Sequence, residues 1–316
     1  NGPGNISGRT ADIPNLVNGV EYEFGVFAGS PDGCYSEQAG LATATPTAGA
    51  GASVFVPIEP ARTYDSRLAG PGGTPDPIPG NHASRVMGVA DAIDIVTGKV
   101  VQRDVVPSGA TAVAFNLTAT DTTSRGWFSV VPGDASTFVT STVNWPGSGD
   151  VIANGLTVKI AANRTVKVFN GSGTTANAVL DIVGYFIDPA QAGNVFHEVT
   201  PTRVYDSRIA GPGSTPDPLP GGANRIISTA NGITPPVTDI VPAGATAVAY
   251  NISAVDTSAR GWFAVTPGDA ATYRSSTVNW PGSGDVIANG QFVKLDANRQ
   301  LKVFNGYGPP TNFVIE

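Results

Sequence analysis

Short stretches that alternate apolar and polar residues recur along the chain, with turn residues between them. Residues 112–119 place Val113, Phe115 and Leu117 on one face, and residues 247–254 repeat this pattern. Alternation with a period of two is typical of β-strands that bury one face. No window of the sequence shows a comparable helical period. The hydrophobic pattern therefore predicts an all-β fold.

Further strand signals follow at a spacing of roughly ten residues. Pro-Gly-Asp turns end two apolar stretches, and Ala-Ala-Asn-Arg separates two others in the manner of a hairpin. Many short strands with regular turns favour a β-sandwich or a jelly-roll-like fold. The additional strands predicted in this way are residues 126–131, 156–160, 165–169, 178–187 and 261–266.

Two blocks of the sequence occur twice. Residues 64–80 return almost unchanged as residues 205–221, and residues 141–155 return identically as residues 276–290. A duplication of this length indicates two copies of a whole domain, and each copy is long enough to bury its own core. The duplication therefore favours a modular, repeated protein over a protein with a single active site.

The predicted repeats cover residues 53–188 and residues 194–316. The second copy ends early, because residues 312–316 align with residues 177–181, after which only the first copy continues through a further apolar stretch. We expect the last strand of the second repeat to be cut in half. Two alternatives remain: the sequence is a fragment, or a strand from another molecule completes the site, as in donor-strand assembly.

Residues 1–47 show a separate pattern. Leu16 and an Asn-Gly turn precede alternating aromatic and aliphatic residues from Tyr22 onward, and the segment closes on Ala-Thr-Pro-Thr. This segment resembles the last strands of a fibronectin type III domain. The resemblance implies that the Tyr22 hydroxyl bonds to nearby backbone. Cys34, the single cysteine, is either a small buried hydrophobe or the partner of a cysteine outside this sequence.

The order of motifs in the two repeats carries a second resemblance. Asp-Ser-Arg is followed by Asn-Leu-Thr or Asn-Ile-Ser, then Ser-Thr-Val-Asn, Ala-Asn-Gly and Lys-Val-Phe-Asn, and the first repeat closes on Val-Gly-Tyr-Phe. This order resembles a tandem β repeat of large secreted proteins from actinobacteria and related bacteria, where it accompanies fibronectin type III modules. The resemblance implies a secreted or cell-surface location, and it brings no established activity for the repeat itself.

Composition agrees with a turn-rich protein and narrows the class of partner. The 316 residues include 39 Gly and 26 Pro, and only 14% are charged. The net charge is −7 and no basic run is present, which argues against a nucleic acid partner. A membrane-spanning helix needs about 18 consecutive apolar residues, and no apolar stretch in the sequence is that long. We expect neither nucleic acid binding nor a membrane span.

The sequence contains no recurring catalytic constellation. His82 and His197, the only histidines, occupy unrelated positions in the two repeats, so a histidine-based triad in each repeat is excluded. The recurring aspartates lie in or beside Gly/Pro turns, where Asp commonly caps backbone N–H groups; calcium binding and acid–base catalysis are the alternatives. We therefore predict no enzymatic activity and no cofactor. The recurring residues are Asp65, Asp76, Asp134 and Asp150, with their counterparts Asp206, Asp217, Asp269 and Asp285.

Two loops in each repeat are candidate ligand or interface sites. Asp65 and Arg67 either clamp the loop that follows them through an ion pair or recognise a sugar or carboxylate, and Asp206 and Arg208 repeat the arrangement. The second loop follows a tryptophan, which either stacks on a sugar ring or packs beneath the loop. Its residues are Trp145 and Asp150 in the first repeat and Trp280 and Asp285 in the second. The other two tryptophans lie in apolar strands and are expected in the core: Trp127 and Trp262.

These observations predict a non-enzymatic structural or adhesive protein, secreted or at the cell surface, built from serial β domains. Its partners would be other copies of itself or neighbouring domains of a longer chain, in a stalk, matrix or filament segment. The alternative is a carbohydrate- or cell-wall-binding module attached to an enzyme outside this sequence. In that case glycan or cell wall would be the partner, contacted by the tryptophan and Asp-Ser-Arg loops.

Overall fold

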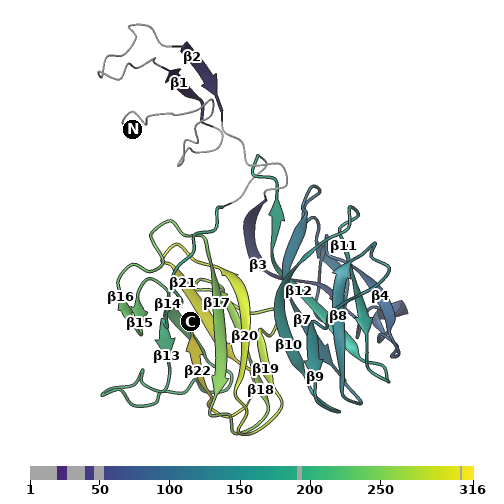
Figure 1. Cartoon of the computed structure of the whole chain (residues 1–316). Helices are drawn as coiled ribbons and strands as arrows, with labels where there is room; N and C mark the ends of the chain where they lie inside the picture. Colours follow the sequence, from purple (N-terminus) through teal and green to yellow (C-terminus); the bar gives the residue numbers. More distant parts are fainter. Residues whose placement is uncertain (1–19, 27–39, 46–52, 191–193, 307) are drawn as a thin grey trace. The chain divides into compact units, whose positions relative to one another are not determined.

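The computed structural model describes residues 20–26, 40–45, 53–190, 194–306 and 308–316 (Figure 1). It confirms an all-β fold of antiparallel strands. The only helical element in this part of the chain is the 3-10 turn Pro71–Gly73, so no helix there is long enough to cross a bilayer. By contacts the chain divides into two compact units: residues 1–53 with 189–191, and residues 54–188 with 192–316.

The first unit contains one described hairpin. Strand β1 (Tyr22–Val26) pairs antiparallel with β2 (Gly40–Ala44), and Tyr22 lies opposite Ala44. The alternation read from Tyr22 onward thus gives a strand. Membership of a fibronectin type III domain stays a prediction, and Cys34 lies outside the described residues.

The first repeat is a sandwich of two four-stranded sheets. Its first sheet has the order β10-β7-β12-β3 and its second the order β4-β11-β8-β9. A short ribbon of β5 and β6 is attached to the sandwich. The strand bounds are β3 (Val54–Asp65), β4 (Ala83–Gly88), β5 (Ala92–Ile93), β6 (Val100–Gln102), β7 (Ala112–Thr120), β8 (Gly126–Pro132), β9 (Val143–Trp145), β10 (Ile152–Lys159), β11 (Thr165–Asn170) and β12 (Asn177–Ile187).

The second repeat has the same topology, strand for strand. Its sheets have the orders β13-β22-β17-β20 and β14-β21-β18-β19, with β15 and β16 as the attached ribbon. The strand bounds are β13 (Tyr205–Asp206), β14 (Asn224–Ser228), β15 (Gly232–Ile233), β16 (Pro236–Val237), β17 (Ala247–Val255), β18 (Gly261–Pro267), β19 (Val278–Trp280), β20 (Ile287–Lys294), β21 (Gln300–Asn305) and β22 (Asn312–Ile315).

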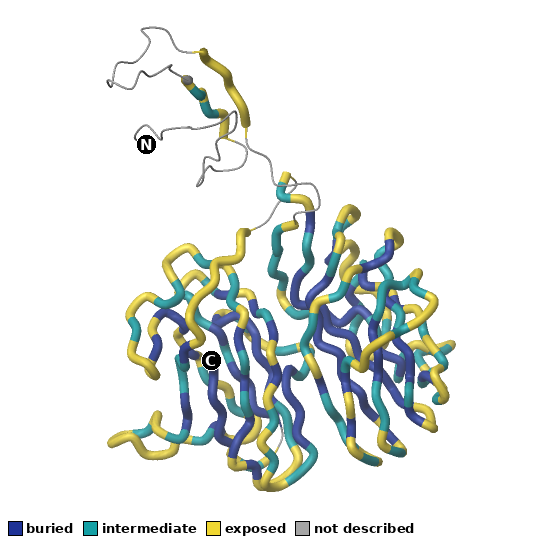
Figure 2. Tube along the Cα trace, viewed as in Figure 1, coloured by how far each residue is buried: buried dark blue, intermediate teal, exposed yellow. Residues whose placement is uncertain are grey.

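Each repeat buries its own apolar core between its two sheets. In the first repeat Phe115 and Leu180 from one sheet are fully buried in one cluster with Phe128 and Val168 from the other. The second repeat builds a separate cluster in the same way. Figure 2 shows the buried segments running along the strands and the exposed segments gathered in the loops. The period-two alternation of the sequence thus decides which side chains fill each sandwich.

The two repeats differ most in their first and last strands. In the first repeat β3 and β12 pair along a long ladder that begins with Val54 opposite Ile187. In the second repeat β22 is short, as expected from the early end of the sequence alignment, and its partner β13 comprises only two residues. Val195 and Phe196, the counterparts of Val54 and Phe55, form no strand and are 66% and 72% exposed.

Candidate functional site

The Asp-Ser-Arg motif of the first repeat is the centre of a buried ion network. Asp65, the last residue of β3, has a fully buried side chain that accepts hydrogen bonds from Nη1 of Arg62 (3.1 Å) and from Nε and Nη2 of Arg67 (2.9 and 2.6 Å). Arg62 also donates to both carboxylate oxygens of Asp181 on β12, at 3.0 and 3.3 Å. Burial outweighs the attraction of Arg62 and raises the pKa of Asp181. The network ties the end of β3 to the middle of β12.

Ser66 completes this connection through its hydroxyl group. The hydroxyl donates to Oδ1 of Asn177 at 2.6 Å and accepts from the backbone N–H of Ala178 at 2.9 Å. Both the serine and the aspartate of the motif are therefore engaged within the protein. This geometry is that of the clamp. Within the motif, only Arg67 remains accessible to an external ligand, because its side chain is 41% exposed.

The second repeat has the same clamp in a more open form. Asp206 accepts hydrogen bonds from Arg203 (2.9 Å) and from Arg208 (2.9 and 2.7 Å), and those from Arg208 lower the pKa of Asp206. Glu316 replaces the buried Asp181 and bonds Arg203 at 2.6 Å with a side chain that is 41% exposed. No three His, Cys, Asp or Glu side chains gather as metal ligands within the described part of the chain.

The aspartates that end the tryptophan loops are turn caps. Asp150 accepts a hydrogen bond from the backbone N–H of Gly147 at 2.6 Å, and Asp285 accepts the equivalent bond from Gly282 at 2.5 Å. A side-chain oxygen that bonds a backbone N–H three residues earlier closes the loop on itself. Capping, the first of the three roles considered for these residues, is thus the one they visibly perform.

Trp145 and Trp280 are core residues, which contradicts a sugar-stacking role. They are 3% and 2% exposed, and their rings pack on Phe128 and Phe263 with centroids 4.8 Å apart in both repeats. Each indole N–H donates to a backbone carbonyl at 2.7 Å, that of Ser124 in the first repeat. A ring with no accessible face cannot stack on a ligand, so the loop packs over the tryptophan.

Trp127 and Trp262 are half-buried on the outer face, where the sequence led us to expect core residues. The reason is strand parity: Phe128 and Phe263 point inward, so the residue before each points outward. The Trp127 indole lies directly over Gly171, where a Cβ would be 1.9 Å from a ring atom. A glycine is needed to seat the ring, and Gly306 serves Trp262 in the same way.

Aromatic neighbours extend both tryptophans into a surface cluster, here called the outer aromatic cluster. In the first repeat Trp127 contacts Phe138 (centroids 5.0 Å apart) and His82 (5.7 Å), and Phe138 contacts Phe169 (5.0 Å). Val139, beside this cluster in sequence, is 91% exposed. The second repeat repeats the cluster with three residues: Trp262, Tyr273 and Phe304.

The junction between the repeats is built from asparagines that sequence reasoning did not select. The Asn289 amide nitrogen donates to Oδ1 of Asn116 at 2.9 Å, and Oδ1 of Asn289 accepts from the backbone N–H of Gly155 at 2.7 Å. The Asn116 amide in turn donates to the carbonyl of Ser276 at 2.8 Å. These bonds join the outer face of β7 and the edge of β10 to β20 and to the segment that precedes β19. Figure 1 shows β10 and β20 side by side at this place.

Close backbone approach and an aromatic pair complete the junction. A Cβ on Gly155 would lie 2.1 Å from the carbonyl oxygen of Gly290, so only glycine lets the two edge strands meet. Phe55 of β3 packs on Phe292 of β20 with ring centroids 4.7 Å apart. The sequence places Asn116 at an outward position of a strand whose inward positions are apolar, which predicts that it faces outward but does not identify its partner.

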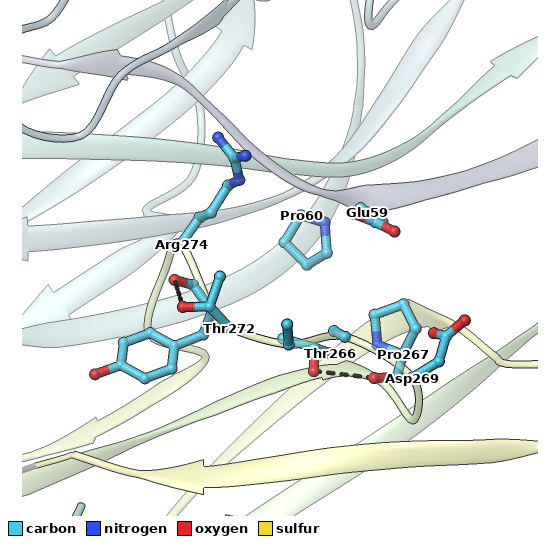
Figure 3. Close-up of a pocket in the computed structure, with 10 residues that line it drawn as sticks. Glu59, Pro60, Thr266, Pro267, Asp269, Thr272 and Arg274 are labelled. Atoms are coloured by element: carbon cyan, nitrogen blue, oxygen red, sulfur yellow. Dashed lines mark hydrogen bonds between the residues drawn. The ribbon is translucent and has the colours of Figure 1, made fainter.

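A hollow of about 300 Å³ adjoins the junction (Figure 3). Glu59 and Pro60 of β3 form one side, and Thr266, Pro267 and residues 269–274 of the second repeat form the other, with Arg274 extending toward the β3 ribbon. The lining residues include two carboxylates and one guanidinium but neither His nor Cys. Among these residues there is no pair of nucleophile and base.

Comparison with protein-family profiles and with curated protein sequences finds no match to this chain. The resemblances given by the motifs therefore remain expectations. What can be said of function rests on the clamp, the outer aromatic clusters and the junction.

Replacing Asp65 by alanine should destabilise the first repeat by about 3 kcal/mol, the lower end for breaking a buried ion pair, because Arg62 keeps Asp181 as a partner. The measurement is the free energy of unfolding from denaturant titration, with Asp134→Ala, at an exposed turn, as the matched control. Equal stability of the two variants would contradict the clamp.

Replacing Trp145 by alanine should cost about 3–5 kcal/mol, because a large buried ring is lost and its cavity remains. Trp127→Ala removes a half-buried ring of the same size and should cost less than half as much. Thermal unfolding followed by circular dichroism compares the two variants. A larger loss for Trp127→Ala would show that the core assignment is wrong.

Proposed function

We propose that this chain is a non-enzymatic segment of a secreted or cell-surface protein, in which serial β domains serve a structural or adhesive role. The observation that carries this proposal is the junction. Its two repeats contact through directional hydrogen bonds between buried asparagines as well as through their connection along the chain. A fixed contact of this kind suits a protein that presents or spaces domains.

The chemistry of the junction supports a fixed arrangement. Asn116 and Asn289 are each 2% exposed, and a buried amide that loses its partner costs about 1–3 kcal/mol. Sliding one repeat on the other would leave the Asn116 amide and the Asn289 side-chain oxygen without their partners across the junction. The junction therefore favours one register of the two repeats over shifted registers. An apolar contact of the same size would favour that register less strongly.

The surroundings of the histidines and of the clamp carboxylates support a structural role. His82 belongs to the outer aromatic cluster, and His197 lies in an exposed stretch. The most strongly connected carboxylates, Asp65 and Asp206, are held by arginines of their own repeats. The hydrogen bonds of these carboxylates therefore stabilise the folded repeats.

The test of the fixed junction is Asn289→Ala. This change leaves the Asn116 carbonyl and the Gly155 N–H without partners, so the free energy that holds the repeats together should fall by about 1–3 kcal/mol. Small-angle scattering of the full chain should then show a broader distribution of distances, and protease cleavage near the repeat connection should be faster.

The matched control is Asn154→Ala, which changes the same position of the same motif in the first repeat. Asn154 is exposed, and its amide donates only to Thr142 of its own repeat. The control should scatter as the parent chain does at low protein concentration. If Asn289→Ala also scatters as the parent does, the junction does not hold the repeats and the proposal fails.

A second candidate function is binding to carbohydrate or cell wall. The specific observation in its favour is the outer aromatic cluster, which presents a half-buried tryptophan in both repeats. Aromatic faces at a surface suit sugar rings, and two copies would add avidity. In this version the contacts are Trp127 and Trp262 in place of the buried Trp145 and Trp280.

The double variant Trp127→Ala/Trp262→Ala separates this candidate from the first. Binding to purified cell wall or to a glycan array should fall at least about tenfold, a loss of roughly 1.4 kcal/mol. Val96→Ser, which removes an apolar side chain that is 74% exposed elsewhere on the first repeat, is the control. Unchanged binding by the double variant would remove the cluster as a glycan site.

A further inference from the structure

The junction joins two different surfaces, although both repeats carry both of them. The surface on the first repeat, here called surface A, is the outer face of β7 and β10: Ala114, Asn116, Thr118, Ala153 and Gly155. The surface on the second repeat, here called surface B, lies along β19, the segment before it and β20: Ser276, Asn279 and Asn289. A contact between unlike surfaces is heterologous. It therefore leaves surface B of the first repeat and surface A of the second repeat free.

Surface A is covered on the first repeat and open on the second. Asn116 and Ala153 are 2% and 6% exposed, whereas Asn251 is partly exposed and Ala288 is exposed. The glycines show the same difference. A Cβ on Gly155 would meet the Gly290 carbonyl at 2.1 Å, whereas a Cβ on Gly290 would meet nothing closer than 4.0 Å.

Surface B shows the opposite difference. Asn279 and Asn289 are 4% and 2% exposed in the second repeat. Their counterparts Asn144 and Asn154 are exposed in the first repeat, within a block that is identical in sequence. The chain thus retains one open surface A on its second repeat and one open surface B on its first.

We propose that these two open surfaces bind each other between molecules, so that the second repeat of one chain docks on the first repeat of a second copy of this chain. Asn251 of one copy takes the part of Asn116, and Asn154 of the other takes the part of Asn289. Because the contact is heterologous, each docked copy presents a further open surface, and the assembly grows head to tail into a ring or an open filament.

The contact between copies is weaker than the junction within one chain. Thr157 is the counterpart of Phe292 on β20, and Phe196, the counterpart of Phe55, lies outside the sheet. The aromatic pair of the junction is therefore missing between copies. Covalently connected repeats also meet at an effective concentration in roughly the millimolar range, which separate copies lack. Assembly should consequently need high protein concentration.

Sedimentation velocity of the full chain over a range of concentrations tests the proposal. The parent chain should form progressively larger species as concentration rises. Asn251→Arg blocks surface A of the second repeat and Asn154→Arg blocks surface B of the first, so each variant alone should remain a monomer. An equimolar mixture of the two should give a dimer that does not grow, because only one complementary pair of surfaces remains.

Asn298→Arg, which adds the same charge on an exposed turn, is the control and should assemble as the parent does. Gly290→Ala is a milder variant: it has room within the chain, yet it would meet the carbonyl of Gly155 in the next copy, and it should also abolish assembly. A parent chain that stays monomeric at every concentration, a single arginine variant that still assembles, or a mixture without dimers would each overturn the proposal.

This inference goes beyond the proposed function, which concerns the contact inside one chain. Different experiments would refute the two proposals. Loosening by Asn289→Ala reports on the internal junction at low concentration. Head-to-tail growth reports on Asn251 and Asn154, which make no contact across that junction. The arginine variants must scatter as the parent does when dilute, which verifies that the internal junction is intact.

Discussion

The arrangement of the two repeats depends on a single buried amide, that of Asn289. Its nitrogen donates to Asn116 and to the carbonyl of Thr277, and its oxygen accepts from Gly155. The donors and the acceptor of the Asn289 amide therefore all have partners, one in its own repeat and two across the junction. An amide satisfied in this way costs little to bury, but the same amide displaced by one residue would cost far more. This difference makes a small polar contact selective for one register.

The same block of sequence experiences two environments in this protein. The side chains of Asn144 and Asn154 meet solvent along one edge of the first repeat, and their identical counterparts Asn279 and Asn289 are buried beside the neighbouring repeat. Small and amide side chains suit both conditions, because they bond to water as readily as to protein and add no large apolar surface. Identity of sequence between copies therefore does not imply identity of role. The neighbour decides which copy is covered.

Most of the fold could be predicted from the sequence, because the period-two alternation fixed the strands and their inward faces. The clamp was one of two alternatives for Asp65 and Arg67, and ion pairing between residues so close in sequence needs little knowledge of the fold. Of the tryptophans, Trp127 was predicted in the core and is half-buried on the outer face, whereas packing beneath its loop was one of the two alternatives for Trp145 and is the one the structure shows. Trp127 shares an apolar strand with Phe128, and only parity distinguishes the ring that points outward; Trp145 looked like a loop residue but ends β9. The junction depends on residues more than a hundred positions apart, which no local pattern brings together.

The pairing of β3 with β12 has a mechanical consequence. Val54 lies opposite Ile187, so the chain enters and leaves the first repeat at the same end of one antiparallel ladder. Tension applied through the two flanking segments would open this ladder one pair at a time from that end, with no more than a few hydrogen bonds loaded at once. Such a domain resists pulling on its ends poorly. An array of these repeats under load would have to transmit force sideways, from the surface of one sandwich to the next.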